Sequence, residues 1–312
     1  MRPEPPAKLD RRTFIRRAGV IGGTGLVLAG SPALLAACGG SSTTTTAEEL
    51  SLSSDLGGTQ LVGLFNYTGN YLVTGAPQRL PFTIATPEGP PAESGPDTLT
   101  VRLRNGDRIG DPVVLTRHQD GTPIGYYPLI TTFDTVGTWS IITDLDGREV
   151  SQSFAVQTPA SVPLIQPGQP MPSVLTPTVD DGRGVTPICT NVPPCPLHTQ
   201  TLADALALRT PVALLIGTPQ FCQTGVCGPV LDLLLELKPE FPSVEFLHAE
   251  VYNNPNSGGD PAAAGLAPVV NSYGLSFEPS LFIANPNGTV ATRLDNIFDR
   301  TEMRRALASV SA

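Results

Sequence analysis

The sequence predicts a multidomain chain in which an all-β part is followed by an α/β part. From residue 50 to 158, short segments of alternating apolar and polar residues are separated by turn residues, with no helical period. Residues 159–187 are rich in proline, and from 188 to 312 strand-like and helix-like segments alternate. At 312 residues, the chain is long enough for two ordinary domains.

The all-β prediction rests on the strict alternation of apolar and polar residues within short segments. Leu99, Val101 and Leu103 alternate with polar residues, which gives a strand one apolar face. Asn105 and Gly106 then supply the residues that a tight turn needs. Further strands are expected at 113–118, 126–133, 137–143 and 150–156. About seven short strands of this kind fit an immunoglobulin-like β-sandwich.

The proline-rich residues 159–187 are predicted to link the two parts. Proline has no backbone N–H donor, so the stretch is not expected to join a β-ladder. Fully extended, such a linker could hold the two parts up to about 75 Å apart.

The C-terminal part, 188–312, is expected to fold in the order β-α-β-α-β-β-α. A helix should begin near Pro229, because apolar residues then recur at helical spacing. Asp299 and Glu302 form an N-cap signature before the last helix. Strands are expected at 211–218, 244–252, 280–284 and 289–294, and short helices at 202–208 and 267–273.

This order of elements, together with the Cys222 to Cys227 turn and Pro279, resembles the thioredoxin-fold family over roughly residues 195 to 312. The resemblance implies that Pro279 is a cis-proline, and that Glu278 and Pro279 lie opposite Cys222 and offer backbone groups to a substrate. The chain departs from the family in two ways. Four residues, not two, separate the cysteines, and the strand at 211–218 lacks the buried acid that many thioredoxins use as a proton acceptor.

The chain has five cysteines, and Cys38, which follows Leu-Ala-Ala in a pattern that resembles the lipobox of bacterial lipoproteins, is expected to be lipidated. Three connectivities are open to the other four, and sequence neighbourhood favours Cys189 with Cys195 and Cys222 with Cys227. The first pair is expected to be a structural disulfide. The second is the candidate catalytic pair, because a helix N-terminus favours a thiolate, with Cys222 attacking and Cys227 resolving. A purely structural second bond is an open alternative.

Two other functions compete with disulfide exchange. One is a non-enzymatic binding lipoprotein whose disulfides are only structural. The other is a Cu(I)-handling chaperone in which Cys222 and Cys227 bind the metal with His248 as third ligand, although a hydrogen-bonded core histidine is the more common role for such a residue. His198 lacks partners at zinc-like spacing, and the sequence assigns no metal and no cofactor.

The first 37 residues are typical of an export signal. Arg11 and Arg12 lie in a basic run that resembles a twin-arginine signal, twenty uncharged residues follow, and Leu-Ala-Ala before Cys38 resembles the lipobox of bacterial lipoproteins. Residues 38–49 would then form a tether to the outer face of the bacterial cytoplasmic membrane.

A net charge of −9 argues against nucleic acid as a partner, because phosphate binding needs clustered Lys and Arg. The sequence therefore predicts an exported, lipid-anchored thioredoxin-like protein that exchanges disulfides with envelope proteins carrying thiols or disulfides.

Overall fold

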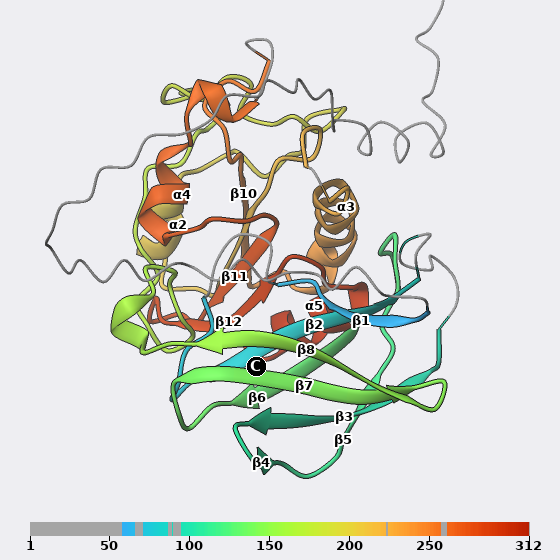
Figure 1. The fold of residues 1–312 in the computed structure, drawn as a ribbon. Coiled ribbons are helices and arrows are strands. Elements are labelled where there is room, and N and C mark those ends of the chain that lie inside the picture. The colour runs from blue at the N-terminus through green and yellow to red at the C-terminus, as the bar shows by residue number, and fades with distance from the viewer. Residues whose placement is uncertain are drawn as a thin grey trace, which may run out of the picture. The chain divides into compact units, whose positions relative to one another are not determined.

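The computed structural model describes residues 58–65, 71–86, 89, 95–222, 224–256 and 261–311 (Figure 1). All of them belong to one compact unit, Ser53–Ala312. The predicted export signal and tether, with Arg11, Arg12 and Cys38, lie outside the described residues. Across the part of the chain that is described, every helix is too short or too polar to cross a membrane.

Two antiparallel sheets form the all-β part. One has the strand order β1-β2-β6, and the other has the order β4-β3-β7-β8 with β5 also paired to β3. The all-β prediction is confirmed, whereas the immunoglobulin-like assignment stays a prediction. The strands are β1 (Gln60–Gly63), β2 (Pro77–Ala85), β3 (Thr98–Asn105), β4 (Arg108–Ile109), β5 (Val113–Thr116), β6 (Tyr127–Thr132), β7 (Gly137–Leu145) and β8 (Arg148–Val156).

The core of the all-β part is built by the apolar face of each strand. On β3, Leu99 and Val101 are buried while Thr100 between them is exposed, as the alternation predicts. Phe82 of β2 and Ile141 of β7 belong to the same buried cluster, which therefore draws on both sheets.

The α/β part has a four-stranded sheet in the order β10-β9-β11-β12, with β9 and β10 parallel and the other neighbours antiparallel. This confirms the expected order of elements. The strands are β9 (Val212–Ile216), β10 (Glu245–Ala249), β11 (Ser280–Ala284) and β12 (Val290–Asp295). The helices are α2 (Leu202–Ala207), α3 (Cys227–Leu237), α4 (Pro268–Tyr273) and α5 (Arg300–Ala308), with 3-10 turns η1 (Pro159–Ser161), η2 (Lys238–Glu240) and η3 (Pro261–Ala264).

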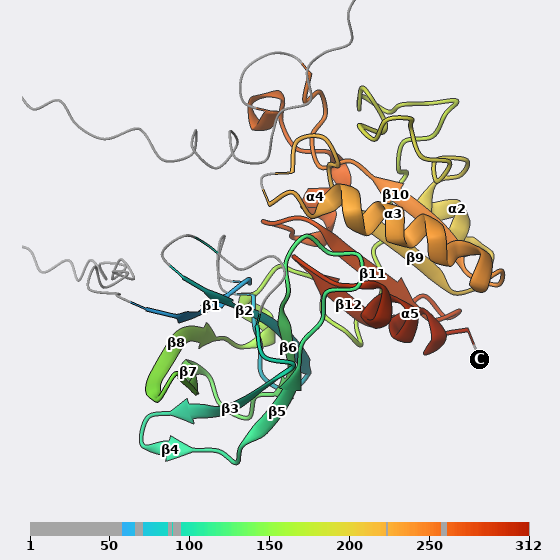
Figure 2. The same cartoon turned by 90° about the vertical axis from the view of Figure 1, so that its right-hand side faces the viewer.

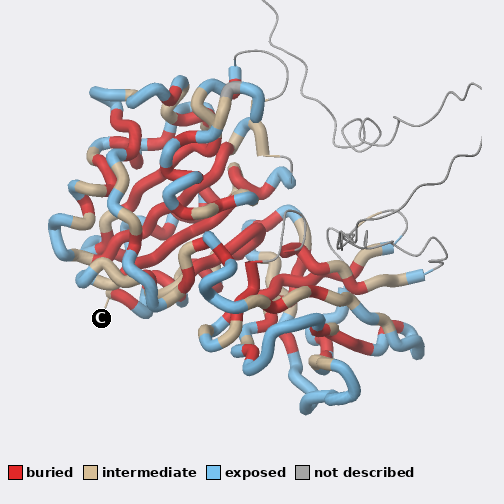
Figure 3. Tube along the Cα trace, turned by 60° about the vertical axis from the view of Figure 1, so that its left-hand side comes forward, coloured by how far each residue is buried: buried red, intermediate tan, exposed pale blue. Residues whose placement is uncertain are grey.

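Helices cover both faces of this sheet (Figures 1 and 2). On β9, Leu214 lies in the buried cluster that includes residues of α2 and α4, whereas Leu215 lies in the cluster that includes residues of α3 and α5. The central strands β9 and β11 are consequently buried along their whole length (Figure 3). Strands covered on both faces read as continuous apolar runs, which is how they appear in the sequence.

Residues 159–187, which we call the strap, are not the free spacer that the prolines suggested. Leu164 is buried, and the backbone N–H of Ile165 donates to the carbonyl of Tyr273 at 3.2 Å. Further along, the N–H of Gly168 donates to the carbonyl of Val290 at 2.8 Å. Proline removes only its own donor, so the residues between the prolines still pair with neighbouring backbone.

An ion pair joins β2 to α5. Arg79 donates through Nε and Nη2 to the two carboxylate oxygens of Glu302, at 2.8 and 2.6 Å, and both side chains are almost fully buried. The hydroxyl of Tyr126 also donates to Glu302. Although burial alone would raise the pKa of Glu302, the charge and hydrogen bonds of Arg79 hold that pKa below its ordinary value.

Candidate functional site

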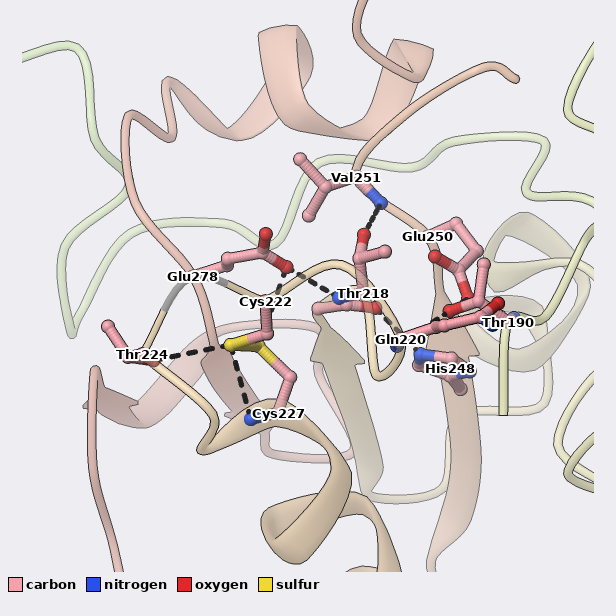
Figure 4. Close-up of a disulfide and its surroundings, with 11 residues drawn as sticks. Thr190, Thr218, Gln220, Cys222, Thr224, Cys227, His248, Glu250, Val251 and Glu278 are labelled. Carbon is pink, nitrogen blue, oxygen red and sulfur yellow. Dashed lines mark hydrogen bonds between the residues drawn. A yellow bond between two sulfur atoms is a disulfide. The ribbon is translucent and has the colours of Figure 1, made fainter. Parts of the chain in front are cut away.

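A disulfide joins Cys222 and Cys227 where the loop after β9 enters α3 (Figure 4). The two Cα atoms are 5.9 Å apart, and Cys227 is the first residue of the helix. The buried apolar face of α3, which includes Val230 and Leu234, anchors the helix against the sheet and so fixes the position of its first turn. The predicted pairing is confirmed.

The two sulfur atoms have different environments. Cys227 is 1% exposed, whereas Cys222 is half-buried. The backbone N–H of Cys227 points to Sγ of Cys222 at 3.3 Å, and the hydroxyl of Thr224 lies 3.2 Å from the same sulfur. When the bond is reduced, these groups and the positive end of the helix dipole favour a thiolate on Cys222.

Glu278 supplies a buried carboxyl group next to the inner sulfur. Its Oε2 lies 3.5 Å from Sγ of Cys227 and accepts a hydrogen bond from the backbone N–H of Thr218 at 2.5 Å (Figure 4). Burial raises the pKa of Glu278 to about 7. The Glu278–Pro279 bond is cis, as predicted.

The sequence placed Glu278 opposite Cys222, but its carboxyl group faces Cys227. The buried acid beside the cysteines is not on β9, where the family pattern places it, but in the loop before β11. Its signal was present in the sequence, since Glu278 directly precedes the proline that was expected to lie beside the cysteines.

The expected Cys189–Cys195 disulfide is not formed, and both cysteines are free and buried. Their sulfur atoms face two imidazole rings: Cys195 Sγ is 3.3 Å from Nε2 of His198 and 3.5 Å from Nδ1 of His248, and Cys189 Sγ is 3.7 Å from the same Nδ1. The hydrogen bond between the two sulfurs lowers the pKa of Cys189 and raises that of Cys195. The sequence suggested no metal ligands here, yet these four side chains have the composition of a metal site.

This second group of cysteines and histidines lies directly behind the disulfide loop. Nε2 of His248 is 2.9 Å from the carbonyl oxygen of Gly217, the residue after β9. A Cβ atom on Gly217 would lie 3.6 Å from Sγ of Cys227, so Gly217 lies between the two groups. Thr190 makes a second link, because its hydroxyl accepts from the backbone N–H of Gln220 at 3.2 Å.

The Cu(I) arrangement considered from the sequence does not match this geometry. His248 was the candidate third ligand beside Cys222 and Cys227, but its Nδ1 faces Cys189 and Cys195, and its Nε2 is engaged with Gly217. The inner sulfur of the disulfide is accompanied by a carboxyl group rather than by an imidazole.

His118, Asp299 and Glu302 also lie close enough together to be considered as a metal site. Each already has a structural partner. Asp299 caps α5 and pairs with His118 at 3.0 Å, and Glu302 binds Arg79. This group is therefore explained by the packing of α5.

No protein-family model matches the chain, and no curated protein matches it. Among solved structures, a thioredoxin-family thiol:disulfide interchange protein from Chlorobium tepidum TLS is similar with 13% identity and a TM-score of 0.31, over 47% of this chain and 99% of that one. Two crystal structures of titin M10–obscurin-like 1 Ig complexes, one of them a mutant, are similar at 17% and 14% identity with TM-scores of 0.18 and 0.19. They cover 28% and 32% of this chain, and 80% and 95% of the matched chains.

Proposed function

We propose that this chain is a thioredoxin-like protein that exchanges disulfides with exported proteins. The observation that carries the proposal is the asymmetry of the Cys222–Cys227 bond. One sulfur is half-exposed at the N-terminus of α3, and the other is buried beside the carboxyl group of Glu278. An accessible attacking thiol with a buried resolving thiol is what two-step disulfide exchange requires.

In the first step, the reduced chain attacks a substrate disulfide. The thiolate of Cys222 forms a bond to one substrate sulfur, the substrate S–S bond breaks, and the other substrate sulfur leaves as a thiolate. The N–H of Cys227 at the start of α3, with the positive end of the helix dipole, stabilises the attacking thiolate before the step.

In the second step, the mixed disulfide is resolved. The thiol of Cys227 transfers its proton to the carboxylate of Glu278, and the resulting thiolate attacks Sγ of Cys222. The bond from Cys222 to the substrate breaks, and the second substrate sulfur leaves and is protonated. Two electrons have passed to the substrate, which is now a dithiol, and the chain carries the Cys222–Cys227 disulfide. The reverse sequence oxidises a substrate dithiol.

Glu278 thus acts as the proton acceptor in place of the buried acid that β9 lacks. Its position before Pro279 also supports the substrate-binding role proposed for these two residues, since an extended substrate that reaches Cys222 would pass along this loop. Export through the signal of residues 1–37 and lipid attachment at Cys38 would present the site to envelope proteins at the outer face of the cytoplasmic membrane.

The test is a trapping experiment. Cys227→Ser should accumulate mixed disulfides with envelope proteins, because the thiol that ejects the substrate is absent, and Cys222→Ser is the matched control that should trap none. Non-reducing electrophoresis with mass spectrometry reads the result. Equal loss of melting temperature in both variants with no trapped protein would show a structural disulfide instead, as would a reduction potential below about −300 mV.

A further inference from the structure

Four side chains with metal-binding atoms converge next to the disulfide loop, and none of them belongs to the disulfide. Cys189, Cys195 and His198 come from one segment of the chain, and His248 comes from β10. One donor atom from each lies within 4.8 Å of the donor atoms of the other three, and all four side chains are buried. The proposed exchange reaction uses none of them.

Four of the six distances between these donor atoms match a tetrahedron around a zinc ion. With Zn–S bonds of about 2.3 Å and Zn–N bonds of about 2.05 Å, tetrahedral ligands lie about 3.3 Å apart for two nitrogens and about 3.6 Å apart for a nitrogen and a sulfur. The two imidazole nitrogens, Nδ1 of His248 and Nε2 of His198, are 3.3 Å apart. Three of the four sulfur-to-nitrogen distances are 3.3, 3.5 and 3.7 Å, and the fourth is within 4.8 Å.

The hydrogen bond behind His248 fixes which of its nitrogens can bind a metal. The carbonyl of Gly217 only accepts, so Nε2 carries the proton and the lone pair of Nδ1 points toward the two sulfurs. Donation of the second ring N–H to a backbone carbonyl is the usual support of a zinc-binding histidine. On the sulfur side, the backbone N–H of Cys195 donates to Sγ of Cys189 at 3.3 Å, which stabilises a thiolate there.

We propose that Cys189, Cys195, His198 and His248 bind one Zn²⁺ ion in a closed, structural site. Two thiolates and two neutral imidazoles complete the tetrahedron, so no position is left open for water or substrate. Binding releases the proton of each thiol, and the charges of the two thiolates and the metal cancel within a buried space. The four-donor set with two nitrogens favours zinc over Cu(I), which is selected by thiolate and thioether ligands.

Such an ion would hold the segment 189–198 against β10, immediately behind the disulfide loop. Gly217 would transmit this support, because its carbonyl accepts the His248 hydrogen bond and a Cβ atom added to it would lie 3.6 Å from Sγ of Cys227. Thr190 adds a second link through Gln220. The metal site is distinct from the Cys222–Cys227 pair, and the proposal does not depend on disulfide exchange.

Metal content and a cobalt spectrum test the proposal on the full-length chain. We expect one zinc ion per chain by elemental analysis after reduction and titration with ZnCl₂. Titration of the reduced, metal-free chain with Co²⁺ alone should give the visible bands of tetrahedral cobalt and a thiolate-to-metal charge-transfer band, and ZnCl₂ should abolish both. A reduced chain that binds neither ion would overturn the proposal.

Variants locate the ion. Cys195→Ser and His198→Gln should lower zinc affinity by at least about 100-fold. The double variant Cys222→Ser with Cys227→Ser should keep the full cobalt spectrum, and loss of the spectrum in that variant would overturn the assignment. If a variant of a metal ligand does not fold, the structural role of zinc is tested on the wild type instead. Chelation of its zinc should lower the melting temperature, and an unchanged melting temperature after zinc removal would refute a structural site.

Discussion

Glu278 places a carboxyl group beside a sulfur that water does not reach. Burial raises the pKa of Glu278 to about 7, so near neutral pH the group is divided between its acid and carboxylate forms. A group in this state can take a proton from Cys227 in one direction of exchange and return it in the other. Glu278 thereby provides, from the loop before β11, the buried acid that β9 lacks.

Replacing Glu278 by Gln should slow the resolution of the mixed disulfide by about 100-fold, because no carboxylate remains to accept the proton of Cys227. In the wild type, the rate should rise with pH through about 7, as the carboxylate form appears. Rapid-quench alkylation of the mixed disulfide measures this step. Glu240→Gln, on the exposed carboxylate that pairs with Arg304, is the matched control and should leave the rate unchanged.

The same variant has an equilibrium signature that does not depend on activity. An acid whose pKa is raised by folding destabilises the fold above that pKa, since the unfolded chain solvates the charge more easily. Glu278→Gln should accordingly be more stable than the wild type above pH 7, and the difference should shrink as the pH falls toward 4.5. Denaturant unfolding at pH 8 and pH 5 measures it. Equal stability of the two proteins at pH 8 would contradict a raised pKa.

For single residues, the sequence predicted those features that depend on residues close together along the chain. The pairing of Cys222 with Cys227 and the cis bond before Pro279 are both local, and both were predicted. The partners of Cys189 and Cys195 were not, because His248 is 53 residues from Cys195 along the chain. The alternation of residues on its strand indicates that His248 is buried, but it does not identify which side chains His248 faces.

Elements with a strong period were the most predictable. The helical spacing after Pro229 gave α3, and the Asp299 signature gave the start of α5, where the carboxylate accepts from the N–H of Glu302. The strap was not predictable, because the loss of N–H groups at prolines says nothing about the carbonyls and N–H groups of the residues between them. What those groups bind is set by the sheet that lies alongside.

The contact between β2 and α5 should depend on its buried ion pair. Arg79→Met leaves the carboxylate of Glu302 buried without its cation, so we expect a loss of about 3–5 kcal/mol in the free energy of unfolding. The exposed pair of Arg104 and Glu149 provides the control, and Arg104→Met should cost less than about 1 kcal/mol. Urea unfolding measures both.

The pH dependence of this pair has a definite sign. The pKa of Glu302 is lowered in the folded chain, so its contribution is present above the ordinary value of 4.5 and is lost as the pH falls below it, through the lowered pKa. The difference in stability between the wild type and Arg79→Met should therefore narrow below pH 4.5. A constant difference across this range would show that Arg79 acts only through packing.

For the whole molecule, the proposed exchange reaction depends on where the chain is located. The predicted export signal and lipobox lie outside the described residues, so experiment has to test the location. Cys38→Ala should remove lipid attachment and release the protein from the membrane, because a net negative chain has no electrostatic attraction to anionic lipid. Fractionation with mass spectrometry of the mature N-terminus checks this. An unmodified Cys38 in a membrane-bound protein would contradict it.

The strap has a further consequence for pairing between two copies of the chain. β12 is an edge strand of its sheet, and exposed edges invite pairing with the same edge of another copy. The strap occupies the start of this edge, where the N–H of Val290 donates to the carbonyl of Gln169 and Pro170 forms a bridge with Thr289. Proline presents no donor on its outer side, so the strap ends the sheet without offering a new edge to a second copy. We therefore expect the strap to hinder edge-to-edge pairing of two copies at the start of β12.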